Sequence, residues 1–257
     1  MPTPENLTIP ISGLSERVTG FCTTRQGGIS PAPYQSLNLG LHVGDDPQNV
    51  LANRAILNAS LPMPPVWLNQ VHGTSVFDAN QIFQLNAQQS VPTADAAVTT
   101  IVNRPIAILT ADCLPIVMVN QEGTVLGVAH AGWRGLALGV LEATLLALQK
   151  ASPDMQNWSA WVGPGIGAQA FQVGQEVYDT FASQHAEYLV FFTPDLNQPN
   201  KWFADLAGLA AHRLSLMGAQ SIYQSQRCTV GEAQHFFSYR RDGKTGRMAT
   251  VAWLNEA

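Results

Sequence analysis

The stretch IAILTADCLPIVMVNQEGTVLGVAHAGWRG, residues 106–135, decides the fold of this chain. Its apolar runs at 106–110, 116–120 and 124–129 are short and bounded by turn residues, which is typical of β-strands. The turn residues Gln121 and Glu122 separate the second run from the third. We therefore predict an antiparallel hairpin at this point of the chain.

This hairpin brings a cysteine and a histidine together. A two-residue loop at Gln121 and Glu122 places Cys113 directly opposite His130, and a longer loop shifts this pairing by a residue or two without separating them. Opposed residues of an antiparallel pair have Cβ atoms about 4.5–5.5 Å apart. A thiolate and an imidazole at that distance can share a metal ion or form a Cys–His nucleophile pair.

His72 is the best candidate for a third metal ligand. It stands in NQVHGTS before Gly73, at a break between two predicted strands, where a side chain can be aimed away from a sheet. Two histidines and one cysteine leave the fourth position of a tetrahedral zinc ion open, which is typical of a catalytic zinc site. Such an ion lowers the pKa of a bound water molecule to about 7. We therefore predict a single-site metalloenzyme with catalytic ligands His72, Cys113 and His130.

The residues around Cys113 and His130 favour a reactive site. A lone cysteine between Asp112 and Leu114 is most often a buried small hydrophobic residue. HAGWRG, residues 130–135, however combines a histidine, an arginine and two glycines at a strand-to-helix junction, where backbone N–H groups can also receive an anion. TADCLP, residues 110–115, places a carboxylate beside the thiol. A plain structural turn rarely needs so many reactive groups.

The composition indicates a compact globular protein without a polyanionic partner. Of the 257 residues, 46% are hydrophobic and only 12% are charged, which argues against disorder. The net charge of -5 leaves no basic surface for nucleic acid or an anionic membrane, and no apolar run reaches the roughly 20 residues of a membrane-spanning helix. Three distant cysteines and an N-terminus without a signal-peptide pattern indicate a reducing, cytoplasmic location.

The remaining elements mix helices and strands without a regular βαβ rhythm. We expect strands at 18–24, 66–71, 74–77, 158–163 and 189–193, and helices at 47–59, 136–150 and 203–217. Asp46 is the expected N-cap of the first helix, with Pro47 at its first position. Residues 236–240 and 248–254 are expected to form a last hairpin around the turn DGKTGR. This order favours an α+β fold class, with one domain over residues 1–257.

Several arginines are candidate anion-binding residues. Arg25 opens RQGGISPAPYQSLNLGLHVGDD, a Gly- and Pro-rich segment too long for a simple turn, which also contains His42. Arg134 follows Gly132 and Trp133, and Arg240 and Arg241 are adjacent. In a chain so poor in charge, an arginine beside glycines or after Gly-Trp is more typical of anion binding than of a solvated surface.

At this point the motifs resemble those of a known family. The segments are FCTTRQGGIS, SLNLGLHVGDD, LNQVHGTSV, ADAAVTT, LTADCLPIV, HAGWRGL, VGPGIG and FFSYRRDGKTGR, and they extend over residues 21–253. They resemble the YfiH-like family, which has been called laccase-domain, peptidoglycan editing factor and purine nucleoside phosphorylase. In that family the histidine of QVHG, the cysteine of TADC and the histidine of HAGWRG bind zinc, which here are His72, Cys113 and His130.

The resemblance implies a mixed β core surrounded by helices, similar to that of deamidating toxins that use a Cys–His pair. It also implies phosphorolysis of adenosine, inosine, guanosine and methylthioadenosine, together with adenosine deaminase activity. The expected partners are therefore a small-molecule nucleoside and phosphate. We expect Asp112 or a metal-bound water molecule to handle protons at the leaving base. Substrate or phosphate binding is expected of Arg25, Asn38, Arg134 and Arg241.

Other functions were weighed against this one. A metal-free Cys113–His130 amidase or deamidase, acting in the editing of peptidoglycan precursors, needs only the same pair. A multicopper laccase needs about ten histidines whereas this chain has six, although copper supplied in excess can occupy the single site. A non-enzymatic metal-dependent binding protein has no use for an open coordination position beside arginines. We expect a monomer or a weak dimer.

Overall fold

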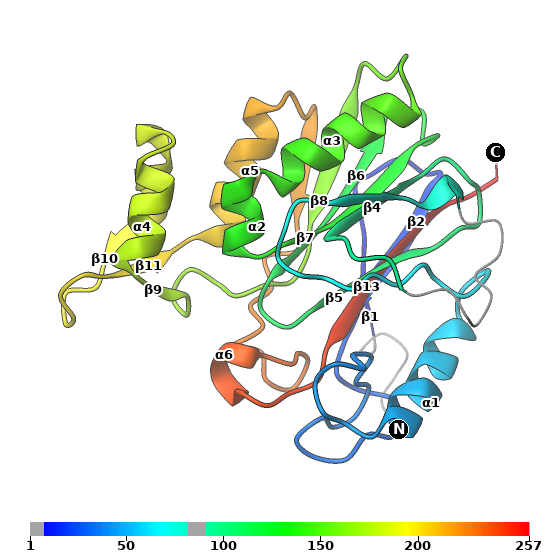
Figure 1. Ribbon diagram of the computed structural model, residues 1–257, viewed down its shortest axis with the longest axis horizontal. Coiled ribbons are helices and arrows are strands. Elements are labelled where there is room, and N and C mark those ends of the chain that lie inside the picture. The colour runs from blue at the N-terminus through cyan, green and yellow to red at the C-terminus, as the bar shows by residue number, and fades with distance from the viewer. Residues whose placement is uncertain (1–7, 82–90, 257) are drawn as a thin grey trace.

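The computed structural model describes residues 8–81 and 91–256. These residues form an α+β structure, as predicted, with three sheets and helices packed around them (Figure 1). The expectation that the chain has no signal peptide concerns residues 1–7, which lie outside the described residues.

A mixed six-stranded sheet forms the centre of the molecule, in the strand order β12-β8-β6-β7-β4-β3. The pairs β12–β8 and β3–β4 are parallel, and the other pairs are antiparallel. The strands are β12 (Ser221–Gln224), β8 (Trp158–Val162), β6 (Leu114–Asn120), β7 (Leu126–Ala131), β4 (Ala96–Thr99) and β3 (Val76–Asp78). Every residue of β6 and β7 is buried, and for this reason both strands stand in the sequence as nearly continuous apolar runs.

A four-stranded sheet, in the order β1-β2-β13-β5, covers one face of the central sheet. Its strands are β1 (Thr8–Pro10), β2 (Val18–Thr23), β13 (Met248–Leu254) and β5 (Ile106–Thr110). Val117 and Val119 of β6 pack on this side, together with Ile106 and Ile108 of β5. Side chains alternate along a strand, so Ile116 and Met118, the neighbours of these valines, face the opposite layer.

Helices cover the two outer faces. On the far side of the central sheet lie α2 (Trp133–Leu138), α3 (Val140–Ala151) and α5 (Leu206–Leu216), whose apolar residues share one core with β6 and β7. On the outer face of the four-stranded sheet lies α1 (Pro47–Asn58), where Leu57 packs with Leu109 and Trp253 (Figure 1). Asp46 caps α1 by accepting the N–H of Gln48, and Pro47 is its first residue, as predicted.

The third sheet is small and has the strand order β10-β11-β9. It consists of β10 (Phe192–Pro194), β11 (Lys201–Ala204) and β9 (Gln172–Gly174), and α4 (Gln175–Ala182) follows β9 directly. Two 3₁₀ helices, η2 (Ala79–Gln81) and η3 (Ala186–Phe191), complete the described elements together with α6 (Tyr239–Asp242).

Three predicted elements differ from the structure in their bounds or type. The expected helix at 136–150 is two helices, since Gly139 adopts φ 95° and ends α2 before α3 begins. The expected helix at 203–217 begins only at Leu206, because Asp205 caps it and the preceding residues belong to β11. The expected strand at 189–193 is mostly η3, and only its end enters β10.

The expected C-terminal hairpin is wrong, and so is one of the expected strands. Residues 236–240 form no strand, since Ser238 caps the short helix α6 by accepting the N–H of Arg241, and β13 pairs instead with β2 and β5. Of the two strands expected at 66–71 and 74–77, the first makes only two isolated bridges, from Val66 to Ile106 and from Asn69 to Thr93, and the second becomes β3. In each case a distant strand, absent from any local pattern, supplies the hydrogen bonds.

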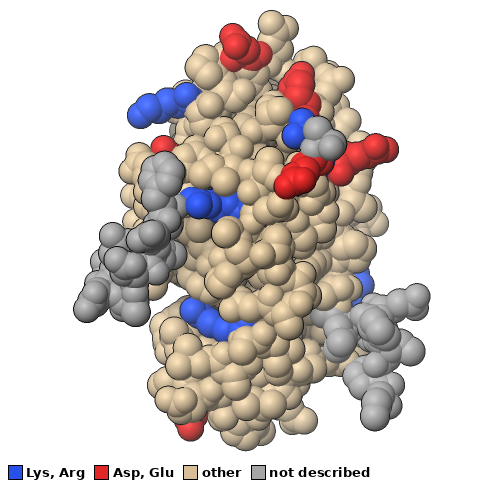
Figure 2. All heavy atoms as spheres, turned by 90° about the vertical axis from the view of Figure 1, so that its right-hand side faces the viewer, with Lys and Arg blue, Asp and Glu red and all other residues tan. Residues whose placement is uncertain are grey.

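The described surface matches the low charge of the sequence. Figure 2 shows Lys and Arg side chains scattered singly over one face, without a basic patch. Within residues 8–81 and 91–256, no helix combines the length and the apolar character that crossing a bilayer requires.

Candidate metal centre and its cavity

The β6–β7 hairpin places Cys113 and His130 close together in a register that differs from the expected one. The loop has four residues, so Pro115 lies opposite His130, and Cys113 lies just before β6 at the level of Gly132. The predicted pairing is therefore wrong by two positions, while the predicted proximity is confirmed. Gly132 is needed here, since a Cβ atom on it would lie 2.8 Å from the Cys113 sulfur.

His72 joins this pair from a separate loop. The ligand atoms of His72, Cys113 and His130 all lie within 4.8 Å of one another, and His72 Nε2 is 3.7 Å from Cys113 Sγ. Bond lengths of about 2.0–2.3 Å in a tetrahedral zinc site separate neighbouring donors by roughly 3.3–3.8 Å. The three donors therefore fit a metal ion after small adjustments. No other group of three or more His, Cys, Asp or Glu residues in the described chain could hold one.

A buried carboxylate, Asp95, holds both histidines. Its Oδ1 atom is 2.9 Å from His130 Nδ1 and accepts the backbone N–H of His72 at 2.8 Å. Its Oδ2 atom accepts the N–H groups of Gly73 and Val71 at 2.7 and 3.2 Å. These bonds stabilise the loop in which His72 adopts φ 61°, a conformation uncommon outside glycine. A metal-binding histidine commonly donates its second nitrogen to such a carboxylate.

Sequence reasoning missed the role of Asp95. The residue stands in the segment ADAAVTT, immediately before β4, and its side chain is fully buried. A carboxylate ahead of a buried strand is unusual, because an ionised group loses its hydration there unless it is paired. That signal could have marked Asp95 as a partner of another polar group, although it could not have named the partner.

The electrostatics of the centre favour a charged pair. Burial raises the pKa of the Cys113 thiol, but the positive charge of His130 and hydrogen bonds from His130 and His72 lower it to about 6. Burial lowers the pKa of His130, but the Cys113 charge and the bond to Asp95 raise it to about 9. Burial also raises the pKa of Asp95, and its bonds to His130 and to backbone N–H groups lower it overall. Without a metal, Cys113 and His130 thus form a thiolate–imidazolium pair near neutral pH.

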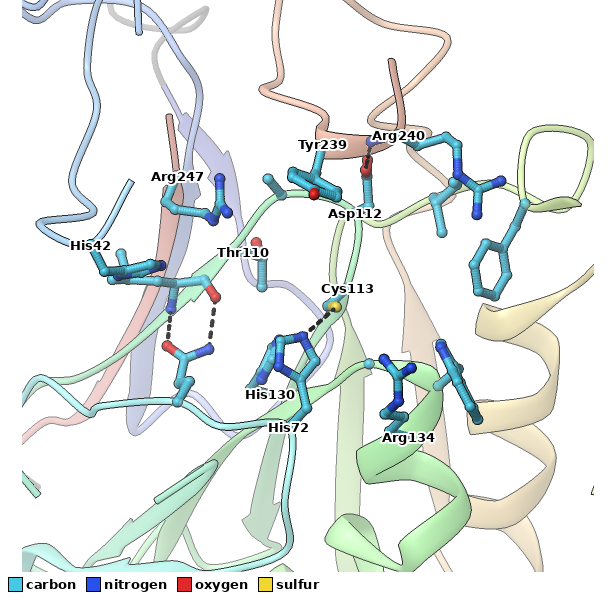
Figure 3. Close-up of a pocket in the computed structure, with 17 residues that line it drawn as sticks. His42, His72, Thr110, Asp112, Cys113, His130, Arg134, Tyr239, Arg240 and Arg247 are labelled. Carbon is cyan, nitrogen blue, oxygen red and sulfur yellow. Dashed lines mark hydrogen bonds between the residues drawn. The ribbon is translucent and has the colours of Figure 1, made fainter. Parts of the chain in front are cut away.

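The three donors lie in the wall of a cavity of about 580 Å³ (Figure 3). Basic side chains line it on both sides of Cys113, with Arg247 and the imidazole of His42 on one side and Arg134 and Arg240 on the other. Burial and the neighbouring arginines lower the pKa of His42, so the arginines carry the positive charge. Aromatic side chains also line it, namely Trp133, Phe171 and Tyr239. A cavity with apolar walls and a few polar groups near a metal centre is typical of a small-molecule site.

The predicted substrate residues divide into two groups. Arg134 and Asp112 line the cavity, whereas Arg25, Asn38 and Arg241 do not. Arg25 donates to the carbonyls of Gln35 and Ala233 and lines a separate hollow. The expectation that these three bind substrate or phosphate therefore has no support from the geometry of this cavity.

Asn38 and Arg241 serve the fold. The buried Asn38 side chain bonds Asp45 Oδ2 and accepts the N–H of Arg247. Arg241 donates to the carbonyls of Thr229, Val230 and Phe236 and pairs with Asp242. Their polar groups are thus used inside the protein.

Asp112 lines the cavity with its carboxylate already engaged. Oδ1 accepts the hydroxyl of Thr229 and Oδ2 accepts the N–H of Arg240, both at 2.6 Å. The residue adopts φ 90°, and its carbonyl accepts the N–H of Ile166. This arrangement supports a positioning role for Asp112 better than the expected proton transfer at the substrate.

Among the cavity residues that sequence reasoning did not assign to the site is Arg247. Its only signal was its place at the end of the motif FFSYRRDGKTGR. Arg240 is one of the arginines that the sequence marks as candidates for anion binding, and His42 lies in the long loop after Arg25. Only the folded chain brings these residues together, from positions about 200 residues apart in sequence.

The chain matches a known family along most of its length. A family model described as multi-copper polyphenol oxidoreductase laccase covers residues 19–255. A protein of Pseudomonas aeruginosa named purine nucleoside phosphorylase is 43% identical over 240 residues, which are 93% of this chain and 95% of that protein. Purine nucleoside phosphorylase YfiH of Escherichia coli is 43% identical over 239 residues, which are 92% of this chain and 94% of that protein.

The fold is also similar to that of a solved structure. The crystal structure of a Neisseria meningitidis protein, described under the family model DUF152, superposes with a TM-score of 0.89. It is 42% identical in sequence, and the match covers 97% of this chain and 99% of the other. The likeness therefore extends over nearly the whole chain.

Proposed function

The chain belongs to the YfiH, or laccase-domain, family, and from that membership we propose that it is a metal-dependent purine nucleoside phosphorylase. Its substrates would be adenosine, inosine, guanosine and methylthioadenosine, with phosphate as the second substrate. The relatives named purine nucleoside phosphorylase support the reaction class. We propose that the protein acts on these small molecules in the cytoplasm.

One observation carries this proposal. A single cavity combines a three-donor centre, aromatic side chains and three arginines, namely Arg134, Arg240 and Arg247. Aromatic faces suit a purine base, and guanidinium groups suit phosphate, which they bind in a planar, two-pronged manner. Its volume of about 580 Å³ is within the range of small-molecule pockets.

The reaction needs positioning and charge stabilisation. A phosphate oxygen forms a bond to C1′ of the ribose as the bond from C1′ to the base nitrogen breaks. The bonding electron pair stays on the base, which takes the proton that monohydrogen phosphate gives up, and the products are the free base and ribose 1-phosphate. Arginines that neutralise phosphate allow it to approach C1′, and the enclosing walls exclude water that would compete with it.

His72, Cys113 and His130 would hold the metal ion, and zinc is the ion that this donor set favours. When bound, zinc supplies Lewis acidity to a substrate oxygen or nitrogen atom. Asp95 keeps Nδ1 of His130 occupied, so Nε2 is the nitrogen available to the ion. The single three-donor group of the described residues gives no support for several copper ions, although copper in excess would compete for it.

We propose adenosine deaminase activity at the same cavity. Water would add at C6 of the purine, and the amino group would leave as ammonia, giving inosine. The His, His and Cys donors are chemically close to the His/Cys/Cys sets of zinc-dependent base deaminases. Release of ammonia from adenosine without phosphate would test this activity apart from phosphorolysis.

The main experiment measures products and metal together. Protein incubated with inosine and phosphate should release hypoxanthine and ribose 1-phosphate in equal amounts, and omission of phosphate should stop the reaction. Elemental analysis should find about one zinc per chain. A chelator should abolish the activity and added zinc should restore it.

Cys113→Ala should lose both zinc and activity, whereas Cys228→Ala, at a half-buried cysteine outside the cavity, should keep both. Absence of phosphate-dependent base release would reject the proposal.

A second candidate is a metal-free Cys–His amidase or deamidase, such as one that edits peptidoglycan precursors. The specific observation in its favour is the lowered pKa of Cys113 beside the raised pKa of His130, the arrangement of an activated thiol nucleophile. The phosphorylase and the amidase differ in the treatment that inactivates them, which is metal removal for the first and thiol alkylation for the second. Chelated, metal-free protein that remains fully active and loses its activity to iodoacetamide would favour the amidase.

A further inference from the structure

The two sides of the cavity differ in chemistry. The Arg247 end consists of His42, Thr110 and Arg247, and Figure 3 shows these residues on one side of Cys113. The Trp133 end consists of Trp133, Arg134, Phe171 and Arg240. There Arg134 lies over the ring of Trp133 and Arg240 over the ring of Phe171, at 4.5 and 5.3 Å from the ring centres.

The guanidinium group of Arg247 has N–H donors that bond to no described residue. Its Nη1 donates to the carbonyls of Thr245 and Gly246, whereas Nε and Nη2 bond to no described residue. Its backbone is fixed by bonds with the Asn38 side chain and with the Leu39 N–H. Nε and Nη2 are the pair that binds two oxygens of one anion, and burial, which lowers the pKa of Arg247, strengthens the attraction by removing water.

Two buried hydroxyls near this guanidinium group also lack partners. Thr110 is 1% exposed and lines the cavity, and its Oγ1 atom bonds to nothing in the described structure. Thr245 is also 1% exposed and unpaired, and it lines a hollow of about 400 Å³ that shares His42, Tyr239 and Arg247 with the cavity. An unpaired buried hydroxyl costs free energy, so each is a place where a ligand oxygen can bind.

The charge of this region selects an anion. Lys244 and Arg247 line the adjoining hollow, and none of its described lining residues is acidic. Among the described residues that line the main cavity, the one carboxylate is that of Asp112, which accepts hydrogen bonds from Thr229 and the backbone of Arg240. A small oxyanion would therefore meet donors here without repulsion from a free carboxylate.

We propose that inorganic phosphate is held at the Arg247 end, by Nε and Nη2 of Arg247 and the hydroxyl of Thr110, and that it enters through the hollow beside Lys244. The purine then occupies the Trp133 end, where the aromatic side chains of Trp133 and Phe171, each with an arginine over one ring face, line the cavity. The metal donors lie between the two. This inference rests on the proposed phosphorolysis, and it moves the phosphate site from Arg25 to Arg247.

The test begins with phosphate alone. Binding of inorganic phosphate is measured calorimetrically on the zinc-loaded protein, with and without hypoxanthine, for the wild type and for Arg247→Gln, Thr110→Val and the distant surface control Lys201→Gln. Arg247→Gln should weaken phosphate binding by about tenfold to a hundredfold, since it loses a charged bidentate contact. Thr110→Val should weaken it severalfold, while its melting temperature stays equal or rises because the hydroxyl had no partner.

Kinetics then separate the two substrates. Both variants should raise the KM for phosphate and leave the KM for inosine within about threefold. Unchanged phosphate binding in Arg247→Gln and Thr110→Val, its loss in Arg134→Gln or Arg240→Gln, or no phosphate binding by the wild type in either condition would overturn the proposal. Phosphate binding that depends on Arg247 in a protein that cleaves no nucleoside would leave the subsite standing and reject phosphorolysis.

Discussion

The Oδ1 atom of Asp95 lies 2.9 Å from Nδ1 of His130, and this contact couples the two histidine ligands of the centre. The same carboxylate accepts three successive backbone N–H groups in the loop that carries His72. One buried side chain therefore sets the ring orientation of one ligand and the backbone of another. Movement of Asp95 would therefore displace the metal-binding ring nitrogens of both His72 and His130 relative to the sulfur of Cys113.

Asp95→Asn should weaken zinc binding by about tenfold to a hundredfold, the usual effect of removing such a partner. The amide keeps one acceptor oxygen, but its NH₂ group would face N–H donors of the loop or of His130. Competition with a chromophoric chelator would measure the affinity. Asp154→Asn, at an exposed aspartate on another part of the chain, is the control. Equal zinc affinity in both variants would contradict this role.

The cysteines of the metal-free protein should differ in reactivity. Cys113, with a pKa near 6, should be alkylated by iodoacetamide at neutral pH, with a rate that falls below about pH 6 as the thiolate takes up a proton. Cys22 is fully buried, and burial raises its pKa to about 12, so it should react only after unfolding. Peptide mass spectrometry after timed alkylation would follow both sites. Zinc should protect Cys113, and equal labelling with and without zinc would remove it from the ligand set.

The charged pair should also affect the stability of the metal-free protein. Because the pKa of Cys113 is below that of a free thiol, its contribution is lost as pH falls through about 6. Because the pKa of His130 is above that of a free imidazole, its contribution is lost as pH rises through about 9. The difference in unfolding free energy between the native chain and Cys113→Ala should be largest between these values. Urea unfolding across this pH range would show a flat difference if no such pair exists.

Gly132→Ala should disturb the centre without a general loss of structure. The new methyl group would lie 2.8 Å from Cys113 Sγ and 3.0 Å from His72 Cδ2, so one of the donors must move. Zinc affinity should fall by about tenfold or more. Gly174→Ala is the matched control, since its methyl group would meet only Lys201 Nζ and Glu176 Cγ, at 3.9 and 4.0 Å. Tight zinc binding in Gly132→Ala would show that the donors lie farther from Gly132 than in this structure.

Asp112→Asn separates positioning from proton transfer. Its amide cannot accept from both Thr229 and the N–H of Arg240, so the start of α6 should loosen and the protein should lose about 1–3 kcal/mol of stability. If Asp112 only positions its neighbours, kcat should fall while the pH–rate profile keeps its shape. Disappearance of one limb of that profile would instead identify Asp112 as the acid or base that sequence reasoning expected.

The sequence by itself determined the parts of this protein that depend on local pattern. Apolar runs separated by turn residues predicted β5, β6 and β7, and Asp46 with Pro47 predicted the start of α1. The pair Cys113 and His130 was found although the register was wrong by two residues, because both stand at the same end of a short hairpin. The position of His72 at a break between two predicted strands indicated it as the third ligand, and the family motifs indicated the same residue.

Only the tertiary structure decided what completes the site. Asp95, Thr110 and Arg247 reach the centre through pairings between distant segments, such as the antiparallel contact of β13 with β5. The same pairings explain why the expected C-terminal hairpin does not form, since β13 is buried between β2 and β5. A local pattern reports which side of an element is buried. It does not report which remote strand buries that side, because the packing of the whole core decides this. That packing places the guanidinium group of Arg247 and the unpaired hydroxyl of Thr110 in one cavity.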